Sequence, residues 1–153
     1  MKNFSKGSTA LDVGACDGKW GKLLNDYLII DGVEIYAPNI TKHNLNSIYH
    51  KVYLGDIREF KYGHKYDLII FGDVLEHMSV EDAQKVLEYA WNRCRNLIVA
   101  VPYQWVNRSH YGNPYEVHIQ DDLTPEIVLE RYPKLKPLFI YDRYGYYIKG
   151  DCL

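Results

Sequence analysis

The chain has 153 residues, of which 47% are hydrophobic and 25% charged, and its formal net charge is −2. This length fits one domain, residues 1–153, that buries most of its apolar surface without covalent staples. The small net charge argues against non-specific binding to nucleic acid, although it does not exclude a local basic patch. No apolar run approaches the roughly 20 residues that a membrane span requires.

The cysteines indicate the kind of cellular compartment in which the protein resides. Cys16, Cys94 and Cys152 are odd in number and show no metal-ligand spacing, and no signal peptide is visible. Both features favour a reducing compartment. We therefore expect a cytoplasmic protein, and the sequence predicts no metal site.

Short apolar runs alternate with helical segments in the first half of the chain, a pattern that favours a parallel sheet covered by helices. A helix is predicted over residues 19–26 from apolar side chains at helical spacing, and Pro38 is placed to open a second, short helix. The predicted strands are 9–13, 28–35, 51–54 and 66–71. The last of these is apolar enough to be buried on both faces.

The second half continues this alternation. Ser79 begins a capping-box pattern and a helix, residues 96–101 form a strand, and Thr124 caps another helix. A long loop, 103–122, separates that strand from the last helix. Residues 138–149 alternate around Gly145 and predict an antiparallel hairpin. The predicted fold class is α/β, a Rossmann-like three-layer sandwich with a mostly parallel seven-stranded sheet and a C-terminal antiparallel hairpin.

Polar residues follow four predicted strands in succession: the turn 12–18, Glu34, Asp56 and Asp73. Open α/β sheets bind ligands beyond the carboxyl ends of their strands, where the strand order reverses. Chance rarely places an acid just past four consecutive buried strands. We therefore expect these side chains to gather around one ligand.

Several residues of these segments also have a purely structural interpretation, which stays open at this point. Asp12 would cap the following turn, Glu34 would be a solvated acid at a strand end, and Asp56 would begin an ordinary turn. Cys16 is more typical of a small structural residue than of a nucleophile. Trp20 fits the core beneath the first helix better than a ligand contact.

A dinucleotide is the first candidate ligand, because Glu34 lies twenty residues after Gly14, a spacing that suits an acid on a ribose diol. The turn GACDG, however, lacks the G-x-G-x-x-G pattern. A pyrophosphate needs bare backbone N–H groups. Two nearby carboxylates, Asp12 and Asp17, would each cost on the order of 1 kcal/mol even at water-like dielectric. NAD is therefore disfavoured.

A ligand that combines ribose, adenine and positive charge fits these acids better. The segments ALDVGACDGKW, GVEIYAP, GDIREF, YDLIIFGDVLEH and LIVAVPY resemble, in this order, the successive motifs of class I S-adenosylmethionine-dependent methyltransferases. The resemblance spans roughly residues 9–150. It implies S-adenosylmethionine as cofactor, a cationic molecule without phosphate.

The resemblance also assigns residues to the methionine end of the cofactor. Asp12 would approach the ammonium group, directly or through water, and Asp73 would lie near the same end. The turn would face the methionine moiety through Gly14, Ala15, Cys16 and Gly18. Cys16 replaces the middle glycine of the D-x-G-x-G-x-G pattern of this family, and we expect it to weaken affinity.

The nucleoside end is assigned in the same way. The resemblance implies that Glu34, with Ile35 beside it, accepts hydrogen bonds from both ribose hydroxyls. It also implies that Asp56 and the backbone of Ile57 meet the adenine amino group.

Methyl transfer from a sulfonium requires chiefly alignment and desolvation, and a general base only when the acceptor must lose a proton. His77, at the end of DVLEH, is the candidate base, with a structural histidine at a helix entry as the alternative. The loop 103–122 either walls a substrate pocket or packs onto the sheet. Its side chains considered for this are Tyr103, Trp105, His110, Tyr111, Tyr115 and His118.

Only eight residues precede the first predicted strand, whereas members of this family usually carry helices there. We therefore expect a cleft that is open on one side. A partner chain, a second copy of this chain or the loop after Pro102 would close it, or catalysis would be feeble.

Three functions follow from these features. The first is a methyltransferase acting on an unidentified acceptor, a small molecule rather than nucleic acid. The second is a methyltransferase-like binding or regulatory module that lacks turnover and serves a partner chain. The third is a nucleotide-sugar or NAD enzyme on the same topology. None of the three involves a membrane.

Overall fold

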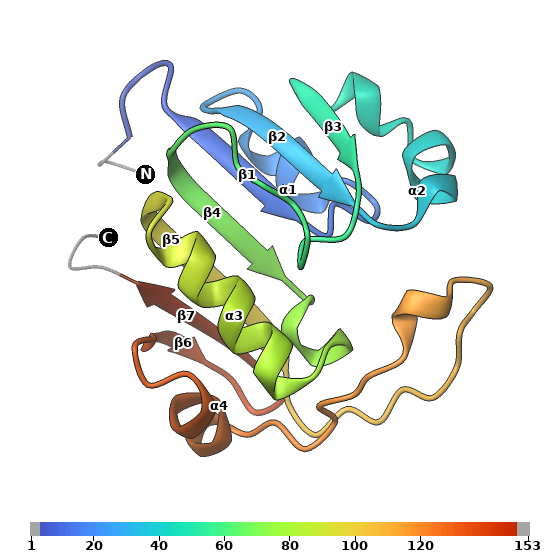
Figure 1. Ribbon diagram of the computed structural model, residues 1–153, viewed down its shortest axis with the longest axis vertical. Helices are drawn as coiled ribbons and strands as arrows, with labels where there is room; N and C mark the ends of the chain where they lie inside the picture. The colour runs from blue at the N-terminus through green and yellow to red at the C-terminus, as the bar shows by residue number, and fades with distance from the viewer. Residues whose placement is uncertain (1–3, 150–153) are drawn as a thin grey trace.

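The computed structural model describes residues 4–149, which contain one seven-stranded sheet with the strand order β3-β2-β1-β4-β5-β7-β6. The strands are β1 (Thr9–Val13), β2 (Ile29–Glu34), β3 (Lys51–Leu54), β4 (Tyr66–Gly72), β5 (Cys94–Pro102), β6 (Lys136–Ile140) and β7 (Tyr144–Lys149). The first five run parallel, and β7 lies antiparallel between β5 and β6. The predicted fold class is confirmed (Figure 1).

Helices cover both faces of this sheet. They are α1 (Lys19–Leu24), α2 (Ala37–Lys42), α3 (Val80–Trp91) and α4 (Pro125–Arg131), with short 3-10 turns η1 (Leu45–Ser47), η2 (Leu75–His77) and η3 (Pro114–Glu116). In Figure 1, α3 crosses in front of the sheet and α1 lies behind it. Among the described residues, no helix is long and apolar enough to cross a membrane.

The alternation of side chains along β1 explains the three layers. Leu11 and Val13 belong to a core cluster with Val86 of α3, whereas Ala10 belongs to a second cluster against which Trp20 of α1 packs. Successive side chains of a strand point to opposite faces, so an apolar strand contributes side chains to both clusters.

The predicted helix starts are confirmed by their caps. The Ser79 hydroxyl accepts a hydrogen bond from the backbone N–H of Asp82 at 3.1 Å, and the Thr124 hydroxyl accepts one from that of Ile127 at 3.2 Å. Each cap satisfies one of the free N–H groups at a helix start. Pro38 lies in the first turn of α2, as predicted.

The C-terminal hairpin is present, but the predicted position of its turn is wrong. Residues 141–143 connect β6 to β7, and Gly145 lies inside β7, paired with Val101 of β5. A Cβ at this position would lie 1.7 Å from the hydroxyl oxygen of Tyr103. Gly145 is therefore explained by the close approach of Tyr103, which local sequence does not reveal, and not by a turn.

The order of the strands creates a switch point between β1 and β4, because the chain moves outward from β1 to β3 and then returns to the other side of β1 at β4. The turn after β1 and the residues after β4 therefore meet at one edge of the sheet. The segment after β5, yellow to orange in Figure 1, runs across this edge toward α2. Ligands bind at such a switch point in open α/β folds.

Candidate cofactor site

A cavity of about 370 Å³ opens at the switch point. It is lined by the turn after β1, the ends of β2 and β4, the residues after β3, and the loop after β5. The predicted site residues that line it are Gly14, Ala15, Cys16, Glu34, Ile35, Asp56, Ile57, Asp73 and His77. The volume lies within the range of small-molecule and cofactor pockets. Asp12 and Gly18 are not among the lining residues.

The turn after β1 has a conformation that glycine favours. Gly14 and Gly18 have φ angles of 74° and 81°, and Cys16 between them has a φ angle of 44°. The backbone N–H groups of Gly14 and Ala15 both donate to the carbonyl of Val33, at 2.9 and 3.0 Å. The turn is thus fixed to the end of β2, with Cys16 strained in the left-handed region.

This strain gives a stability prediction for Cys16→Gly. A left-handed conformation costs an L-residue about 1–2 kcal/mol, and glycine recovers most of it less its greater freedom in the unfolded chain. We expect a net gain of about 1 kcal/mol in the free energy of unfolding, measured by urea denaturation. Cys16→Ala is the matched control, since it removes the sulfur but keeps Cβ. Equal effects of the two variants would contradict the strain argument.

Glu34 is buried at the end of β2, only 3% exposed, so its interpretation as a solvated acid is wrong. Its Oε2 accepts a hydrogen bond from the Cys16 N–H and its Oε1 one from the Tyr36 N–H, both at 2.7 Å. The carboxylate therefore ties the turn to the end of β2. A carboxylate oxygen has two lone pairs, so each oxygen keeps one for a ligand.

Asp56 lines the cavity, but its carboxylate is already paired. The guanidinium of Arg58 donates to both oxygens, from Nε to Oδ1 at 3.0 Å and to Oδ2 at 2.9 Å, and from Nη2 to Oδ2 at 2.5 Å. The backbone N–H of Arg58 also donates to Oδ1, at 2.9 Å. These hydrogen bonds hold the pKa of Asp56 below its usual value. Arg58 also lines the cavity, and sequence reasoning missed it although it lies only two positions after Asp56.

Asp12 lies behind the turn and is 1% exposed. Its Oδ2 accepts a hydrogen bond from the hydroxyl of Tyr49 at 2.5 Å, whereas its Oδ1 has no partner among the described residues. Burial raises the pKa of Asp12 to about 8, with smaller contributions from Asp17 and Glu34, against the lowering effect of the Tyr49 hydrogen bond. Its alternative role as a cap of the turn is not what the structure shows.

The end of β4 contributes Asp73 and His77. Asp73 has a φ angle of 57°, and its Oδ1 accepts a hydrogen bond from the hydroxyl of Tyr144 at 2.5 Å. His77 ends η2, and its Nδ1 lies 3.2 Å from the carbonyl oxygen of Val117. Burial lowers the pKa of His77. Both residues reach the cavity beside the turn after β1.

The loop after β5 closes one side of the cavity with Asn113, Tyr115 and Glu116. The hydroxyl of Tyr36 donates to the carbonyl of Gly112 at 2.8 Å and joins this loop to the end of β2. Of the alternatives for an open cleft, closure by this loop is the one visible here.

The aromatic residues of the loop divide between its two predicted uses. Tyr115 lines the cavity, Tyr103 packs in the core with Tyr147, and Trp105 and Tyr111 are 61% and 80% exposed. His110 is exposed and does not line the cavity. His118 is buried beside His77.

Further lining residues were not predicted as site residues. Trp20, expected in the core, is half-buried and lines the cavity, and so do Asn39, Asn113 and Glu116. Asn113 and Glu116 come from a loop far along the chain, and no local pattern marks their approach. Their contribution depends on the tertiary fold.

The charges at the cavity are mainly negative. Five carboxylates line it, those of Asp17, Glu34, Asp56, Asp73 and Glu116, against two cations, Lys19 and Arg58. Arg58 is neutralised by its pair with Asp56. Such a lining repels phosphate and attracts a cationic ligand.

Comparison with known proteins shows which solved structures share this fold. No family model matches the chain, and no curated protein sequence matches it. Among solved structures, the DhpI–SAM–HEP complex shares 10% identity and a TM-score of 0.72, over 92% of this chain and 77% of that one. An S-adenosylmethionine-dependent methyltransferase from Clostridium acetobutylicum ATCC 824 shares 11% identity and a TM-score of 0.70, over 92% and 82%.

A third similar structure is the small RNA methyltransferase HEN1, with 21% identity and a TM-score of 0.71 over 94% of this chain and 23% of that chain. The chain therefore has the fold of the class I S-adenosylmethionine-dependent methyltransferases. The resemblance of the five sequence segments to this class is confirmed at the level of the fold.

Proposed function

We propose that the chain is one methyltransferase domain that binds S-adenosylmethionine and transfers its methyl group to an acceptor. The observation that carries this proposal is the cavity at the switch point, where five carboxylates face two cations. S-adenosylmethionine has a sulfonium and an ammonium group and no phosphate, so this lining suits it and disfavours NAD. The fold supports the same conclusion.

In this proposal the nucleoside lies over the ends of β2 and β3. Glu34 would accept hydrogen bonds from the ribose hydroxyls with the lone pairs that the Cys16 and Tyr36 N–H groups leave free. Ile35 and Ile57 would provide apolar walls for adenine. Asp56 would meet the adenine amino group only with the oxygen lone pairs that Arg58 leaves unused.

The methionine end would lie over the turn after β1, with Gly14, Ala15 and Cys16 on one side and Asp73 on the other. Asp12 and Gly18 do not line the cavity, so we assign them to the support of the turn. When bound, the cofactor supplies an electrophilic methyl group to a lone pair of the acceptor.

The side chains of the cavity would align the reactants and exclude water, which is the main requirement of this displacement. Where the acceptor must first lose a proton, His77 is the candidate base that reaches the cavity. The carbonyl of Val117 can only accept, so Nδ1 of His77 carries the proton and Nε2 keeps its lone pair. We propose a small molecule as the acceptor.

Calorimetry with S-adenosylhomocysteine on the full chain tests the cofactor assignment. We expect saturable binding that is tighter than that of NAD. No heat and no thermal stabilisation at millimolar ligand would refute the proposal. Binding without methyl transfer across a broad acceptor panel would instead support a module that lacks turnover.

The Glu34→Ala variant tests, by the same calorimetry, whether Glu34 binds the ribose hydroxyls. We expect it to weaken binding of S-adenosylhomocysteine by about 1–3 kcal/mol, because the ribose hydroxyls lose a buried acceptor. Glu59→Ala is the matched control, an exposed acid that does not line the cavity. Thermal melting shows whether each variant is folded. An unchanged affinity in a folded Glu34→Ala protein would remove Glu34 from the ribose site.

A further inference from the structure

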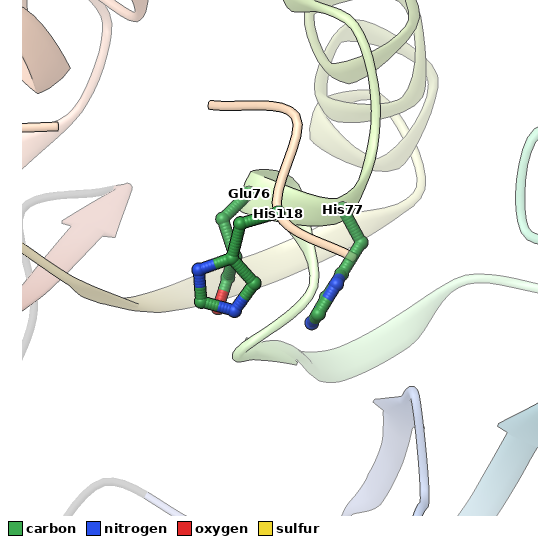
Figure 2. Close-up of side chains that lie close together, drawn as sticks. All are labelled: Glu76, His77 and His118. Carbon is green, nitrogen blue, oxygen red and sulfur yellow. The ribbon is translucent and has the colours of Figure 1, made fainter. Parts of the chain in front are cut away.

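Three metal-ligating side chains converge beside the proposed cofactor cavity. Glu76 and His77 lie in η2, and His118 comes from the loop after β5, about forty positions along the chain. One ligand atom from each lies within 4.8 Å of the others. In Figure 2 the His118 ring overlaps the Glu76 side chain in this view, and the His77 ring lies to one side of them. The two imidazole rings are 4.8 Å apart, edge to face.

The Glu76 carboxylate is the feature that needs an explanation. The residue is 1% exposed, and neither side-chain oxygen has a hydrogen-bond partner among the described residues. The charged groups that act on it, Asp73 and Glu116, are both acidic. Burial raises the pKa of Glu76 well above its usual value, because a buried carboxylate without a donor or a counter-ion is costly; such groups are normally neutralised by a proton, paired or bound to a metal. The site therefore lacks positive charge.

The backbone holds this carboxylate in place. The carbonyl of Glu76 accepts hydrogen bonds from the N–H groups of Ile119 at 2.7 Å and Gln120 at 3.0 Å. These bonds fasten η2 to the segment that follows His118. The amide of Gln120 also donates to the carbonyls of Leu75 and Met78, at 2.8 and 3.1 Å. The three candidate ligands therefore lie on two segments, η2 and the loop after β5. Hydrogen bonds along η2 and at the residue that follows it join these two segments.

Both histidines are oriented as metal ligands are. Nδ1 of His118 lies 2.8 Å from the carbonyl oxygen of Trp105, and Nδ1 of His77 lies 3.2 Å from that of Val117. A carbonyl only accepts, so each Nδ1 carries the proton and each Nε2 has a free lone pair. An imidazole that binds metal almost always donates its other N–H to such an acceptor.

We propose that Glu76, His77 and His118 bind a divalent first-row transition metal ion. Two imidazoles and one carboxylate suit Mn²⁺ to Zn²⁺ better than Mg²⁺ or Ca²⁺, which prefer oxygen ligands. Three ligand atoms about 2.1 Å from one ion lie about 3.4–3.6 Å apart in tetrahedral or trigonal geometry, so a pair now at the limit of 4.8 Å would close by about 1.2–1.4 Å on binding. His77 also lines the cavity, which places the ion at its wall.

The sequence predicted no metal site, because its cysteines show no metal-ligand spacing. His77 and His118 were candidates for other roles, and Glu76 was not considered. As a metal ligand through Nε2, His77 would not act as the proton acceptor. The metal site does not depend on the cofactor proposal, and its test uses no cofactor.

Co²⁺ is the probe for the test, because its visible absorption changes in position and intensity when protein ligands replace its water and alter the coordination geometry. We expect the chelator-treated full chain to bind one Co²⁺ with new absorption bands, and to melt at a higher temperature with Co²⁺ or Zn²⁺ than with Mg²⁺. No Co²⁺ bands and no thermal stabilisation at millimolar Co²⁺ would overturn the proposal.

Two variants test the ligands, and a third serves as the control. Glu76→Gln, which keeps the size of the side chain, and His118→Ala should each weaken Co²⁺ binding by about 100-fold or more. His110→Ala is the matched control, an exposed histidine of the same loop. Circular dichroism shows whether each variant is folded, and Glu76→Gln covers the case in which His118→Ala does not fold. Binding that is unchanged in folded Glu76→Gln protein would assign the ion to another site and overturn the proposal.

Discussion

Asp12→Asn is expected to stabilise the protein at pH 9 by about 3–5 kcal/mol and to change its stability little at pH 4. The carboxyl is buried, with Oδ2 bonded to the Tyr49 hydroxyl and Oδ1 without a partner among the described residues. Burial raises its pKa from 3.8 to about 8. Asparagine resembles the neutral carboxyl in size and keeps an oxygen for Tyr49.

The direction in which the free energy of unfolding changes with pH follows from proton linkage. Between about pH 4 and pH 8 the folded chain holds a proton on Asp12 that the unfolded chain has lost. The free energy of unfolding therefore falls as the pH rises, by about 1.4 kcal/mol per pH unit from this group. Below about pH 4 Asp12 is protonated in both the folded and the unfolded chain. Above about pH 8 the full cost of burying its negative charge lowers the free energy of unfolding.

The measurement is urea denaturation of wild type and Asp12→Asn from pH 4 to pH 9. Asp26→Asn is the control, since Asp26 is an exposed acid close in the chain. We expect the difference between Asp12→Asn and wild type to grow with pH and the Asp26→Asn difference to stay flat. A pH-independent difference for Asp12→Asn would show that Asp12 is ionised in the folded protein throughout this range.

Gly145→Ala is expected to destabilise the protein by about 2–3 kcal/mol, through overpacking. The added Cβ would lie 1.7 Å from the hydroxyl oxygen of Tyr103 and 2.8 Å from Cε2 of Tyr147. Both tyrosines are buried, and their hydroxyls are 2.5 Å apart in a hydrogen bond. Tyr103 begins the loop that carries Glu116 and His118, so its displacement should also loosen this side of the cavity.

Thermal and urea denaturation measure this effect. Gly63→Ala is the matched control, because a Cβ there meets nothing within 4 Å. We expect that variant to stay within about 0.5 kcal/mol of wild type. If Gly145→Ala were equally neutral, Tyr103 would have to move without cost, and the tyrosine pair would not fix the loop.

Most of the sheet could be predicted because its signals are local. The strand 51–54 and the helix starts at Ser79 and Thr124 match the structure. Helix and strand ends differ by one or two residues, as with the strand predicted over 96–101, which extends over Cys94–Pro102. The hairpin turn was predicted in the wrong place. Gly145 is required by the close approach of Tyr103, forty-two positions away in the chain, and not by a turn at this position.

The candidate site was predictable in part for the same reason. Glu34 ends β2, Asp56 lies two residues after β3 and Asp73 directly follows β4. Parallel strands bring their carboxyl ends to one edge, so these side chains had to meet. Their partners were not predictable. The pairing of Asp56 with Arg58 and the burial of Asp12 beneath Tyr49 depend on side-chain packing.

The sequence by itself determined the α/β fold, the edge of the sheet where the acids gather, and the negative character of that edge, because strand patterning and the position of each acid are properties of short segments. Only the tertiary structure decided which side chains face the cavity and which lie behind it. It alone joined Glu76 and His77 to His118, because the path of the loop after β5 is set by contacts across the whole sheet and not by neighbours in the chain.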